Sequence, residues 1–498
     1  MHVFLVRNFS YVTTTTAIFA ASSVTRLTSL QFAVKVTASP ASCSRGSVTV
    51  IVPPQMATTA LATDQPADAQ DRDRAAPGAY WSLGLLLAIN LFNYVDRQVL
   101  SAVEIKIEDE FKLTQAQMGR AATAFLWSYM LFSPIFGRLA ERMSRWFLVG
   151  VGVVVWSLAS GGTGIVHTYM LLLLMRSLVG IGEAAYGPTA PTILSDLFPV
   201  KSRGRILAWF YVAIPVGSAL GYVLGGMIAA RWGWRAAFIA VVPPGLLLGV
   251  WAFLMKDPRH HGHGTAADAV KHKPSRADYV ILAKTPSYVL NTLAMAAMTF
   301  AIGGIAFWMP KFIKLRYEEQ HLRPDLTSDQ LLGHVNFLFG ALSAGSGLIA
   351  TILGGLAGDA LRKRIRGAYL FVSGCAMILA FPILLLMLHV SFPLAWVFLF
   401  IAVFCLFFNT GPTNTALANV THPAIRATAF ALNIFFIHLF GDALSPWLIG
   451  AIADHAKGGL RTAFTLISIL VLLGGALWLW AAKYLDHDTE LAPQRVPT

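Results

Sequence analysis

An acid–base pair inside an otherwise apolar stretch is the first place in this sequence where chemistry could occur. Asp96 and Arg97 lie in a hydrophobic segment, residues 79–103, that is long enough to cross a bilayer as a helix. An ionisable side chain in such a segment costs on the order of 2.5–3.5 kcal/mol on insertion scales. The pair therefore predicts a functional site that faces the inside of a helical bundle. The alternative is that both side chains reach the membrane surface, because only six residues of the segment follow them.

A second set of charges lies in the segment 169–197. Arg176 and Glu183 are seven residues apart, which places them on one face of a helix about two turns from each other. Glu183 falls close to the middle of the segment, where its side chain cannot reach either surface. Such a carboxylate is suited to binding and releasing a proton, and the alternative is a structural polar contact between helices.

Other polar residues in apolar segments are weaker candidates for the same cavity. Adjacent residues point about 100° apart around a helix, so Asp96 and Arg97 need not be partners. His438 and Asp442 are four residues apart and can hydrogen-bond on one face, either as a structural pair or in proton handling. The remaining candidates are Tyr94, Asn409 and Asn414.

The composition is that of a membrane protein with many spans. The mean hydropathy is +0.61, 56% of the residues are hydrophobic and only 13% are charged. The net charge of +13 does not indicate a nucleic-acid-binding protein, because the basic residues recur between apolar segments rather than in one patch. We predict an all-α protein with twelve membrane-spanning helices. Their expected spans are 79–103, 116–140, 146–167, 169–197, 204–230, 235–256, 286–313, 332–357, 367–389, 393–416, 424–450 and 461–485.

The segments fall into two groups of six, residues 79–256 and 286–485, joined by a basic linker, residues 257–285. The linker contains His260, His261 and His263, which we interpret as part of a flexible loop rather than a metal site. Residues 1–78 are interpreted as a disordered tail or the product of an upstream start codon, and residues 486–498 as a second tail. Lys and Arg cluster in the second-to-third, fourth-to-fifth and eighth-to-ninth connections, whereas the first-to-second connection, EIKIEDEFK, is acidic. This asymmetry predicts that both termini are cytoplasmic, although Lys311, Lys314, Arg316 and Arg323, at and after the end of the seventh segment, do not fit it.

The two groups of segments show traces of a duplication. Gly217-Ser-Ala-Leu-Gly221 in the fifth segment corresponds to Gly441-Asp-Ala-Leu-Ser445 in the eleventh, and a short Arg-x-Ala-Phe follows each of them. Asp359 after the eighth segment corresponds to Glu141 after the second. The glycines, Gly217 and Gly221, permit close helix packing and are also candidates for a gating role. Parallel duplication of a six-helix unit predicts two pseudo-symmetric bundles with a binding site between them.

The connection after the second segment resembles the signature loop of the major facilitator superfamily. Gly137, Glu141, Arg142 and Arg145 match its spacing, although the family usually has Asp at position 141 and Gly at position 144. The resemblance implies that Glu141 caps a neighbouring helix and pairs with Arg, latching the cytoplasmic side in one conformation.

Longer stretches are similar to the spinster branch of this superfamily. They are NYVDRQVLSAV from Asn93, RSLVGIGEAAYGPTAPTILSDLFP from Arg176, IPVGSALGYVLGG from Ile214, GGIAFWMPKF from Gly303, FNTGPTNTALANV from Phe408 and RATAFALNIFFIHLFGDALSPWLIGAIAD from Arg426. The resemblance covers about residues 80–485. It implies a monomeric, alternating-access transporter of amphipathic lipids, such as lysophospholipids or sphingosine-1-phosphate, in the cell membrane. Asp96, Arg97 and Glu183 would then line the central cavity, with Arg97 suited to an anionic headgroup and the two carboxylates to proton coupling.

The sequence disfavours the other classes of membrane protein. It contains no G-x-x-x-x-G-K-[ST] phosphate loop, so we expect an ion gradient, with the proton as coupling ion and no cofactor, rather than ATP. A lipid-modifying enzyme would need a nucleophile or a metal motif such as H-E-x-x-H, which the sequence lacks, and a channel does not need two duplicated halves. The alternative within the transporter class is a proton-coupled exporter of drugs or a carrier of small organic anions.

Overall fold

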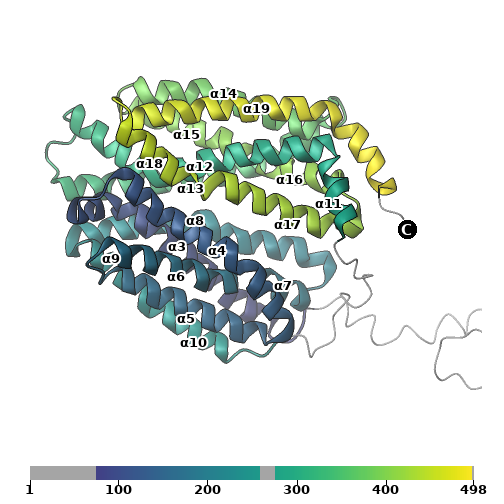
Figure 1. The fold of residues 1–498 in the computed structure, drawn as a ribbon, viewed down its shortest axis with the longest axis horizontal. Coiled ribbons are helices and arrows are strands. Elements are labelled where there is room, and N and C mark those ends of the chain that lie inside the picture. Colours follow the sequence, from purple (N-terminus) through teal and green to yellow (C-terminus); the bar gives the residue numbers. More distant parts are fainter. Residues whose placement is uncertain (1–74, 258–274, 496–498) are drawn as a thin grey trace, which may run out of the picture. The chain divides into compact units, whose positions relative to one another are not determined.

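The computed structural model describes residues 75–257 and 275–495, and every regular element within them is a helix. The helices form two groups, which Figure 1 shows as a purple-to-teal bundle and a green-to-yellow bundle. The N-terminal half contains α3 (Ala79–Phe111), α4 (Gln115–Arg142), α5 (Arg145–Thr163), α6 (Tyr169–Tyr186), α7 (Thr189–Leu197), α8 (Val200–Trp232), α9 (Trp234–Ala240) and α10 (Val242–Phe253). The C-terminal half contains α12 (Pro286–Glu319), α13 (Ser328–Leu361), α14 (Ala368–His389), α15 (Leu394–Phe408), α16 (Thr410–Asn419), η3 (Pro423–Ile425), α17 (Arg426–Ile437), the π-helical turn η4 (His438–Asp442), α18 (Ser445–His455), α19 (Leu460–Leu491) and η5 (Ala492–Gln494).

The linker between the halves is described only in part. A short helix, α11 (Arg276–Ala283), precedes α12. His260, His261 and His263 lie outside the described residues, as does nearly all of the predicted N-terminal tail. At the other terminus, α19 continues beyond the predicted end at residue 485.

Ten helical segments of the described chain are long and apolar enough to cross a membrane. Helices α3 and α4, with 33 and 28 residues, are long enough but are not among these ten. In α3 the reason is a row of polar residues, Asn90, Asn93 and Asp96, all of which are buried. The polar side chains therefore face the protein interior, as expected for a helix that contributes to a functional cavity.

Four of the predicted segments contain a break that hydropathy did not reveal. Residues 169–197 divide into α6 and α7 at Gly187–Pro188, and residues 235–256 divide into α9 and α10 just before Pro243. Proline lacks the N–H that would continue the preceding helix. In the eleventh segment the break lies at Gly441, whose backbone dihedrals are non-helical (φ −101°, ψ −112°). The tenth segment divides at Asn409.

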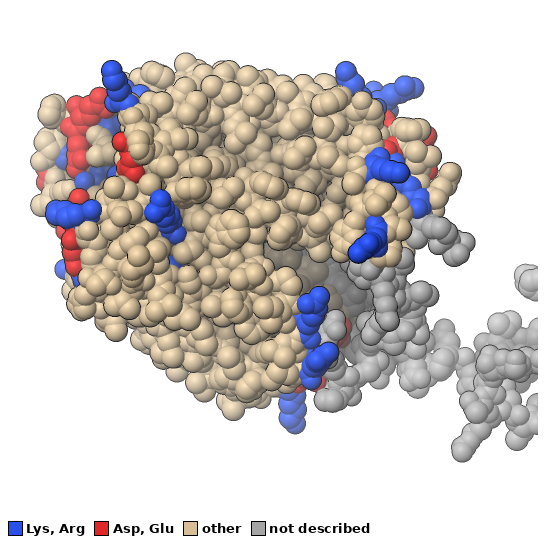
Figure 2. All heavy atoms as spheres, in the orientation of Figure 1, with Lys and Arg blue, Asp and Glu red and all other residues tan. Residues whose placement is uncertain are grey.

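Charged side chains gather at two ends of the molecule, separated by a wide band in which almost none appears on the visible face (Figure 2). We call one end the terminal end, because Ala76, near the start of the described chain, donates there to the Leu197 carbonyl, and the C-terminal end of the chain lies there too (Figure 1). We call the other end the opposite end. The uncharged band between them is the surface expected to face lipid.

The two halves meet at the opposite end, where α4 packs against α18 and α8 against α13. The Asn336 side chain of α13 donates to the Ala102 carbonyl of α3 (2.8 Å), and the Tyr222 hydroxyl of α8 donates to the Ala306 carbonyl of α12. Lys106 of α3 pairs with Asp329 of α13 at 2.8 Å. Together these contacts between helices of different halves close the opposite end, and we call them the seal.

Two predicted loops are helical and belong to this seal. Residues 104–111 continue α3, and residues 314–319 continue α12, where we had expected connections. Three basic side chains here are held by partners: Lys311 donates to Glu108, Lys314 pairs with Glu318 (2.8 Å), and Arg316 donates to the Met387 carbonyl (2.8 Å). These basic residues are thus neutralised or buried in the structure rather than free at the surface.

The repeated glycine motif occupies equivalent places in the two halves. A Cβ atom on Gly217 of α8 would lie 2.6 Å from the Leu91 carbonyl oxygen of α3, the first helix of its half. A Cβ atom on Gly441 would lie 2.9 Å from Thr299 Cβ of α12, the first helix of the other half. Each motif thus lets its helix approach the leading helix of its own bundle, which agrees with a duplicated unit.

Candidate functional site

A cavity of about 550 Å³ lies between the two halves, on the terminal side of the seal. Its wall in the N-terminal half comes from α3, α4, α6, α7 and α8, and its wall in the C-terminal half from α17 and His438 of η4. Most of the lining is apolar or aromatic. The lining residues are Asn90, Asn93, Tyr94, Arg97, Tyr129, Met130, Ser133, Pro134, Glu183, Tyr186, Gly187, Pro188, Pro191, Phe210, Tyr211, Ile214, Ala431, Ile434, Phe435 and His438.

Arg97 and Glu183 form an ion pair in the cavity wall. The Nε and Nη2 atoms of Arg97 both approach the same carboxylate oxygen, Glu183 Oε2, at 2.7 and 2.5 Å. The Arg97 side chain is 22% exposed, whereas that of Glu183 is 1% exposed. Glu183 Oε1 is buried and has no hydrogen-bond partner among the described residues. The guanidinium is thus held at the cavity surface by one oxygen of Glu183.

Aromatic rings surround the Arg97 guanidinium. Its Cζ atom lies 4.9 Å from the ring centroids of both Tyr94 and Phe125 and 5.5 Å from that of Tyr129. Such cation–π contacts contribute about 0.5–1 kcal/mol at exposed sites and about 2 kcal/mol or more when desolvated. The rings fix the position of the cation, and Tyr94 and Tyr129 also line the cavity.

Asp96 and Arg176 lie behind the cavity wall rather than in it. Both side chains are 2% exposed, and neither lines the cavity. The Ser160 hydroxyl of α5 donates to Asp96 Oδ1, while Asp96 Oδ2 has no partner among the described residues. Arg176 lies 5.2 Å from the Phe125 ring centroid, and its Nε and Nη1 atoms likewise find no hydrogen bond in the described chain.

The neighbouring residues Asp96 and Arg97 therefore face different environments, as their angular separation on the helix predicts. Arg97 faces the cavity and pairs with α6, whereas Asp96 faces the bundle interior and bonds to α5. Asp96 is buried and Arg97 lines the cavity, an arrangement that favours the interior site over the alternative of two surface-reaching side chains.

Some candidate residues of the C-terminal half line the cavity or lie next to it, and others do not. His438 lines the cavity, and its Nδ1 atom lies 2.9 Å from Asp442 Oδ1 across the turn of η4. Asn409 and Asn414 do not line the cavity: their amides donate to the carbonyls of Leu406 (2.7 Å) and Thr410 (2.8 Å) nearby in the chain. The structure therefore brings His438 and Asp442, but not the two asparagines, toward the Arg97–Glu183 pair.

The signature-loop residues lie at the terminal end within the N-terminal half. Arg145, the first residue of α5, is buried and pairs with Asp196 of α7 (2.7 Å) and Asp257 beyond α10 (2.9 Å). Arg142 is exposed, and the side chain of Glu141 lies outside the described part of the chain. The sequence analysis did not identify Asp196 or Asp257 as partners, and no local spacing connects them with Arg145.

The remaining predicted gating residues have contacts within one half. A Cβ atom on Gly221 would lie 2.5 Å from the Val95 carbonyl oxygen, so α8 and α3 pack closely at this position, whereas Gly137 has open space around it. Asp359 accepts a hydrogen bond from the Tyr369 hydroxyl at 2.7 Å. Close packing accounts for Gly217 and Gly221, and their gating role stays a prediction.

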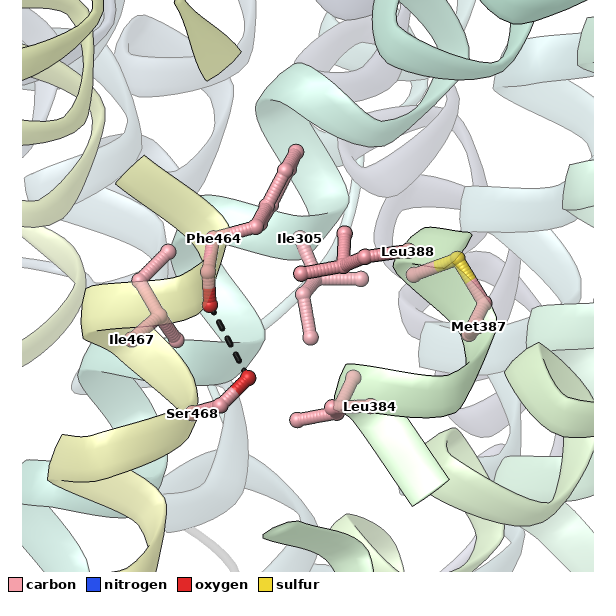
Figure 3. Close-up of a pocket in the computed structure, with 7 residues that line it drawn as sticks. All are labelled: Ile305, Leu384, Met387, Leu388, Phe464, Ile467 and Ser468. Carbon is pink, nitrogen blue, oxygen red and sulfur yellow. Dashed lines mark hydrogen bonds between the residues drawn. The ribbon is translucent and has the colours of Figure 1, made fainter. Parts of the chain in front are cut away.

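A second hollow lies inside the C-terminal half but does not have the character of a binding site. Figure 3 shows its lining residues, Ile305, Leu384, Met387, Leu388, Phe464, Ile467 and Ser468. The one polar side chain, Ser468, donates to the Phe464 carbonyl at 2.9 Å, and the space has no room for a water molecule. Nor do three or more His, Cys, Asp or Glu side chains come together as a metal site in the described ranges.

Comparisons with known proteins agree with this arrangement. Residues 86–446 match the family model described as Major Facilitator Superfamily. The chain is 32% identical to protein spinster homolog 3 of Danio rerio over 83% of this chain and 87% of that protein. It is 33% identical to protein spinster homolog 1 of Homo sapiens, over 83% of this chain and 82% of that protein. It is 31% identical to the sphingosine-1-phosphate transporter SPNS2 of Danio rerio, over 83% of this chain and 86% of that protein.

Solved structures show the same fold. A bacterial homologue of the human lysosomal transporter spinster, in an inward-facing and unoccupied conformation, superposes with a TM-score of 0.72 at 20% identity, covering 83% of this chain and 99% of that one. The xylose transporter XylE of E. coli, in an inward-open conformation, gives a TM-score of 0.63 at 15% identity, covering 81% of this chain and 95% of that one.

A two-bundle helical fold with a central cavity, together with the family match, defines a transporter of the major facilitator superfamily rather than an enzyme. Within that superfamily the chain belongs to the spinster family. The predicted all-α major facilitator fold and the family resemblance are thereby confirmed, and the expected twelve spans are consistent with that fold.

Proposed function

We propose that this protein moves an amphipathic lysolipid-type substrate, such as a lysophospholipid or sphingosine-1-phosphate, by proton-coupled alternating access. The observation that carries the proposal is the Arg97–Glu183 pair in the wall of an otherwise apolar cavity between the halves. A phosphate headgroup needs a cation, and an acyl or sphingoid chain needs an apolar wall, so one cavity provides both requirements.

The geometry of the pair implies that Glu183 and an anionic headgroup compete for the Arg97 guanidinium. An anionic headgroup that binds the guanidinium must take the place of Glu183 Oε2, its present partner. A proton on Glu183 would remove the negative charge and free the guanidinium for the headgroup. Proton binding and substrate binding would then favour each other at the same residue.

Asp96 supplies a second carboxylate to the same charge cluster. With Asp96, Arg97, Arg176 and Glu183 all ionised, the cluster has two positive and two negative charges. Each proton taken up by a carboxylate makes the cluster one unit more positive and so more favourable to an anion. The protonation of either acid can therefore be linked to the loading of an anionic substrate.

The alternative is a proton-coupled exporter of drugs or a carrier of small organic anions on the same fold. The xylose transporter with the same fold shows that the architecture alone does not select a lipid. The sphingosine-1-phosphate transporter among the relatives favours a lipid substrate for this chain. A binding screen of purified protein against lysophospholipids, sphingoid phosphates, sugars and organic anions tests this choice, and preference for a water-soluble sugar or organic anion would refute the lipid assignment.

Proton coupling is tested in proteoliposomes that carry a pH gradient. We expect Glu183→Gln and Asp96→Asn to abolish uphill accumulation of the substrate while the protein remains folded. The matched control is Asp325→Asn, which removes a carboxylate that pairs with Arg323 at 3.0 Å in a surface loop, away from the cavity. Full gradient-driven accumulation by both cavity variants would contradict proton coupling.

Orientation, location and assembly complete the proposal. We infer that the terminal end is cytoplasmic, because the Lys- and Arg-rich connections predicted from the sequence follow α4, α7 and α13 there, and because Lys311, Lys314 and Arg316 of the opposite end are paired or buried. The cavity would then face the cytoplasm, with the external side closed by the seal. We place the protein in the cell membrane as a monomer without a cofactor. Labelling of the termini in intact cells tests the location and the orientation, and mass measurement in detergent tests the monomeric state.

A further inference from the structure

Three charged side chains are buried between the halves at the opposite end, apart from the cavity. Glu104 and Glu108 lie one turn apart on α3, and Lys311 lies on α12 of the other half. Their exposed fractions are 1%, 9% and 8%. Since α3 rises about 1.5 Å per residue, Glu104 is roughly 10 Å along the helix from Arg97. We call these three residues the seal triad.

The seal triad contains two carboxylates, Glu104 and Glu108, but one cation, Lys311, to pair with them. The Lys311 ammonium donates to Glu108 Oε2. Both oxygens of Glu104, and Oε1 of Glu108, are buried without a hydrogen-bond partner among the described residues. With all three groups ionised, the seal triad would carry a net charge of −1 in a closed interface.

Charged groups on the surrounding helices do not supply the missing partner. Lys314 of α12 interacts electrostatically with Glu104 but pairs with Glu318 at 2.8 Å. Asp109 of α3 acts on both Glu104 and Glu108, and Asp454 of α18 acts on Glu108, so both add negative charge.

The other nearby cations have partners of their own. Lys106 of α3 is paired with Asp329 of α13 at 2.8 Å, and Arg235 of α9 is paired with Glu110 at 2.6 Å.

A proton on Glu104 balances this arrangement. A buried carboxylate without a partner is strongly unfavourable in its charged form, and burial of the neutral acid costs much less. Uptake of one proton from water converts the Glu104 carboxylate to the acid and leaves the Glu108–Lys311 ion pair as a neutral unit.

We propose that Glu104 is a second proton-binding site, separate from the cavity, and that its proton stabilises the seal. The two sides of the seal triad belong to different halves, so opening of the opposite end separates Lys311 from α3 and admits water to Glu104. The carboxylic acid then ionises and releases its proton to the solution at that end. Low pH there should hold the seal closed, and rising pH should favour its opening, because the sealed state binds the extra proton.

The inference rests on the alternating opening of the halves that the proposed function includes. It does not depend on the substrate or on proton binding at Glu183. The two ideas can therefore fail separately.

The test measures the conformation of the substrate-free protein. Spin labels at Ile165→Cys and Ser328→Cys, both exposed residues at the opposite end in different halves, report the separation of the halves, with the native cysteines replaced by Ser. Pulsed electron paramagnetic resonance gives the distance distribution in lipid nanodiscs from about pH 5 to about pH 9, a range that brackets a raised carboxyl pKa. We expect the long-distance population to increase with pH.

Variants assign that pH dependence to the seal triad. Glu104→Gln, which imitates the protonated acid, should keep the seal closed at every pH, whereas Glu183→Gln should leave the pH dependence in place. Lys311→Met removes the cation and should move the midpoint to higher pH, which provides a second test should Glu104→Gln not fold. A flat response in the unmodified protein, a pH dependence that survives in Glu104→Gln, or an unchanged midpoint in Lys311→Met would overturn the proposal. Retained pH dependence in a Glu183→Gln protein that still accumulates substrate would instead contradict the proposed function alone.

Discussion

The contact between Asp454 and the start of α4 offers a quantitative test of the seal. Asp454, near the end of α18, accepts hydrogen bonds from the backbone N–H groups of Gln115 (2.9 Å) and Ala116 (2.8 Å). These are the first two N–H groups of α4, which have no partner within their own helix. Because α18 and α4 belong to different halves, the contact exists only while the opposite end is closed.

The expected cost follows from helix capping. Replacing a capping side chain by Ala costs about 0.5–2 kcal/mol, and a negative charge near a helix N-terminus adds about 0.3–1 kcal/mol at an exposed position. Asp454 is exposed, so water replaces part of the lost interaction and the lower part of this range applies. A loss of about 1–2 kcal/mol in the sealed state alone would raise the ratio of open to sealed molecules roughly 5- to 30-fold.

The spin-label pair at positions 165 and 328 measures that ratio directly. Asp454→Ala should show the full shift at constant pH, and Asp454→Asn a smaller one, because Asn keeps a single acceptor oxygen without the charge. Glu319→Ala is the control, since Glu319 pairs with Arg461 at 3.2 Å within the same half. A folded Asp454→Ala protein with an unchanged distance distribution would refute the idea that this cap belongs to the energetics of closure.

Three further predictions concern the cavity wall and helix packing. Arg97→Lys keeps the charge but loses the planar contact with the three aromatic rings, so substrate affinity should fall about tenfold, a loss of about 1.4 kcal/mol; unchanged affinity in a direct binding assay would argue against a headgroup role. Gly221→Val should lower the melting temperature and the yield, because α3 approaches α8 closely at Gly221. Gly137→Ala should change neither, because Gly137 has open space around it. Equal thermal stability of the two variants would contradict the packing argument. Tyr222→Phe removes a hydrogen bond between the halves, worth about 0.5–1.5 kcal/mol, and should raise the open population by up to about tenfold in the same distance measurement; no shift would show that the bond is replaced equally well by water.

The fold and the centre of the candidate site could be predicted because both depend on strong local signals. Long apolar segments define membrane helices, and a charge within one is rare enough to single out Asp96, Arg97 and Glu183. The structure brings Arg97 and Glu183 into contact and places Asp96 behind them. Which neighbour each residue faces depends on the rotation of α3 in the bundle, which hydropathy does not report.

The seal and the terminal-end ion network depend on contacts that are distant in the sequence. Glu104 follows one apolar segment and Lys311 lies near the end of another, so both resemble residues at a membrane surface even though both are buried. The i, i+4 spacing of Glu104 and Glu108 was the available signal that the helix continues with a polar face. Arg145 meets Asp196 and Asp257 from 51 and 112 residues away, a relation that no local pattern contains.

The ion pair that Arg97 forms with one oxygen of Glu183 also constrains how these two positions can change during evolution. A substitution at one position leaves the other charge without its counter-ion, at a cost that reaches about 3–5 kcal/mol for a fully buried pair. A lineage that abandons the pair must pass through this weakened intermediate or change both codons together. The two positions should therefore be retained or replaced together among relatives. An alignment in which they vary independently would show that they do not co-evolve as a pair.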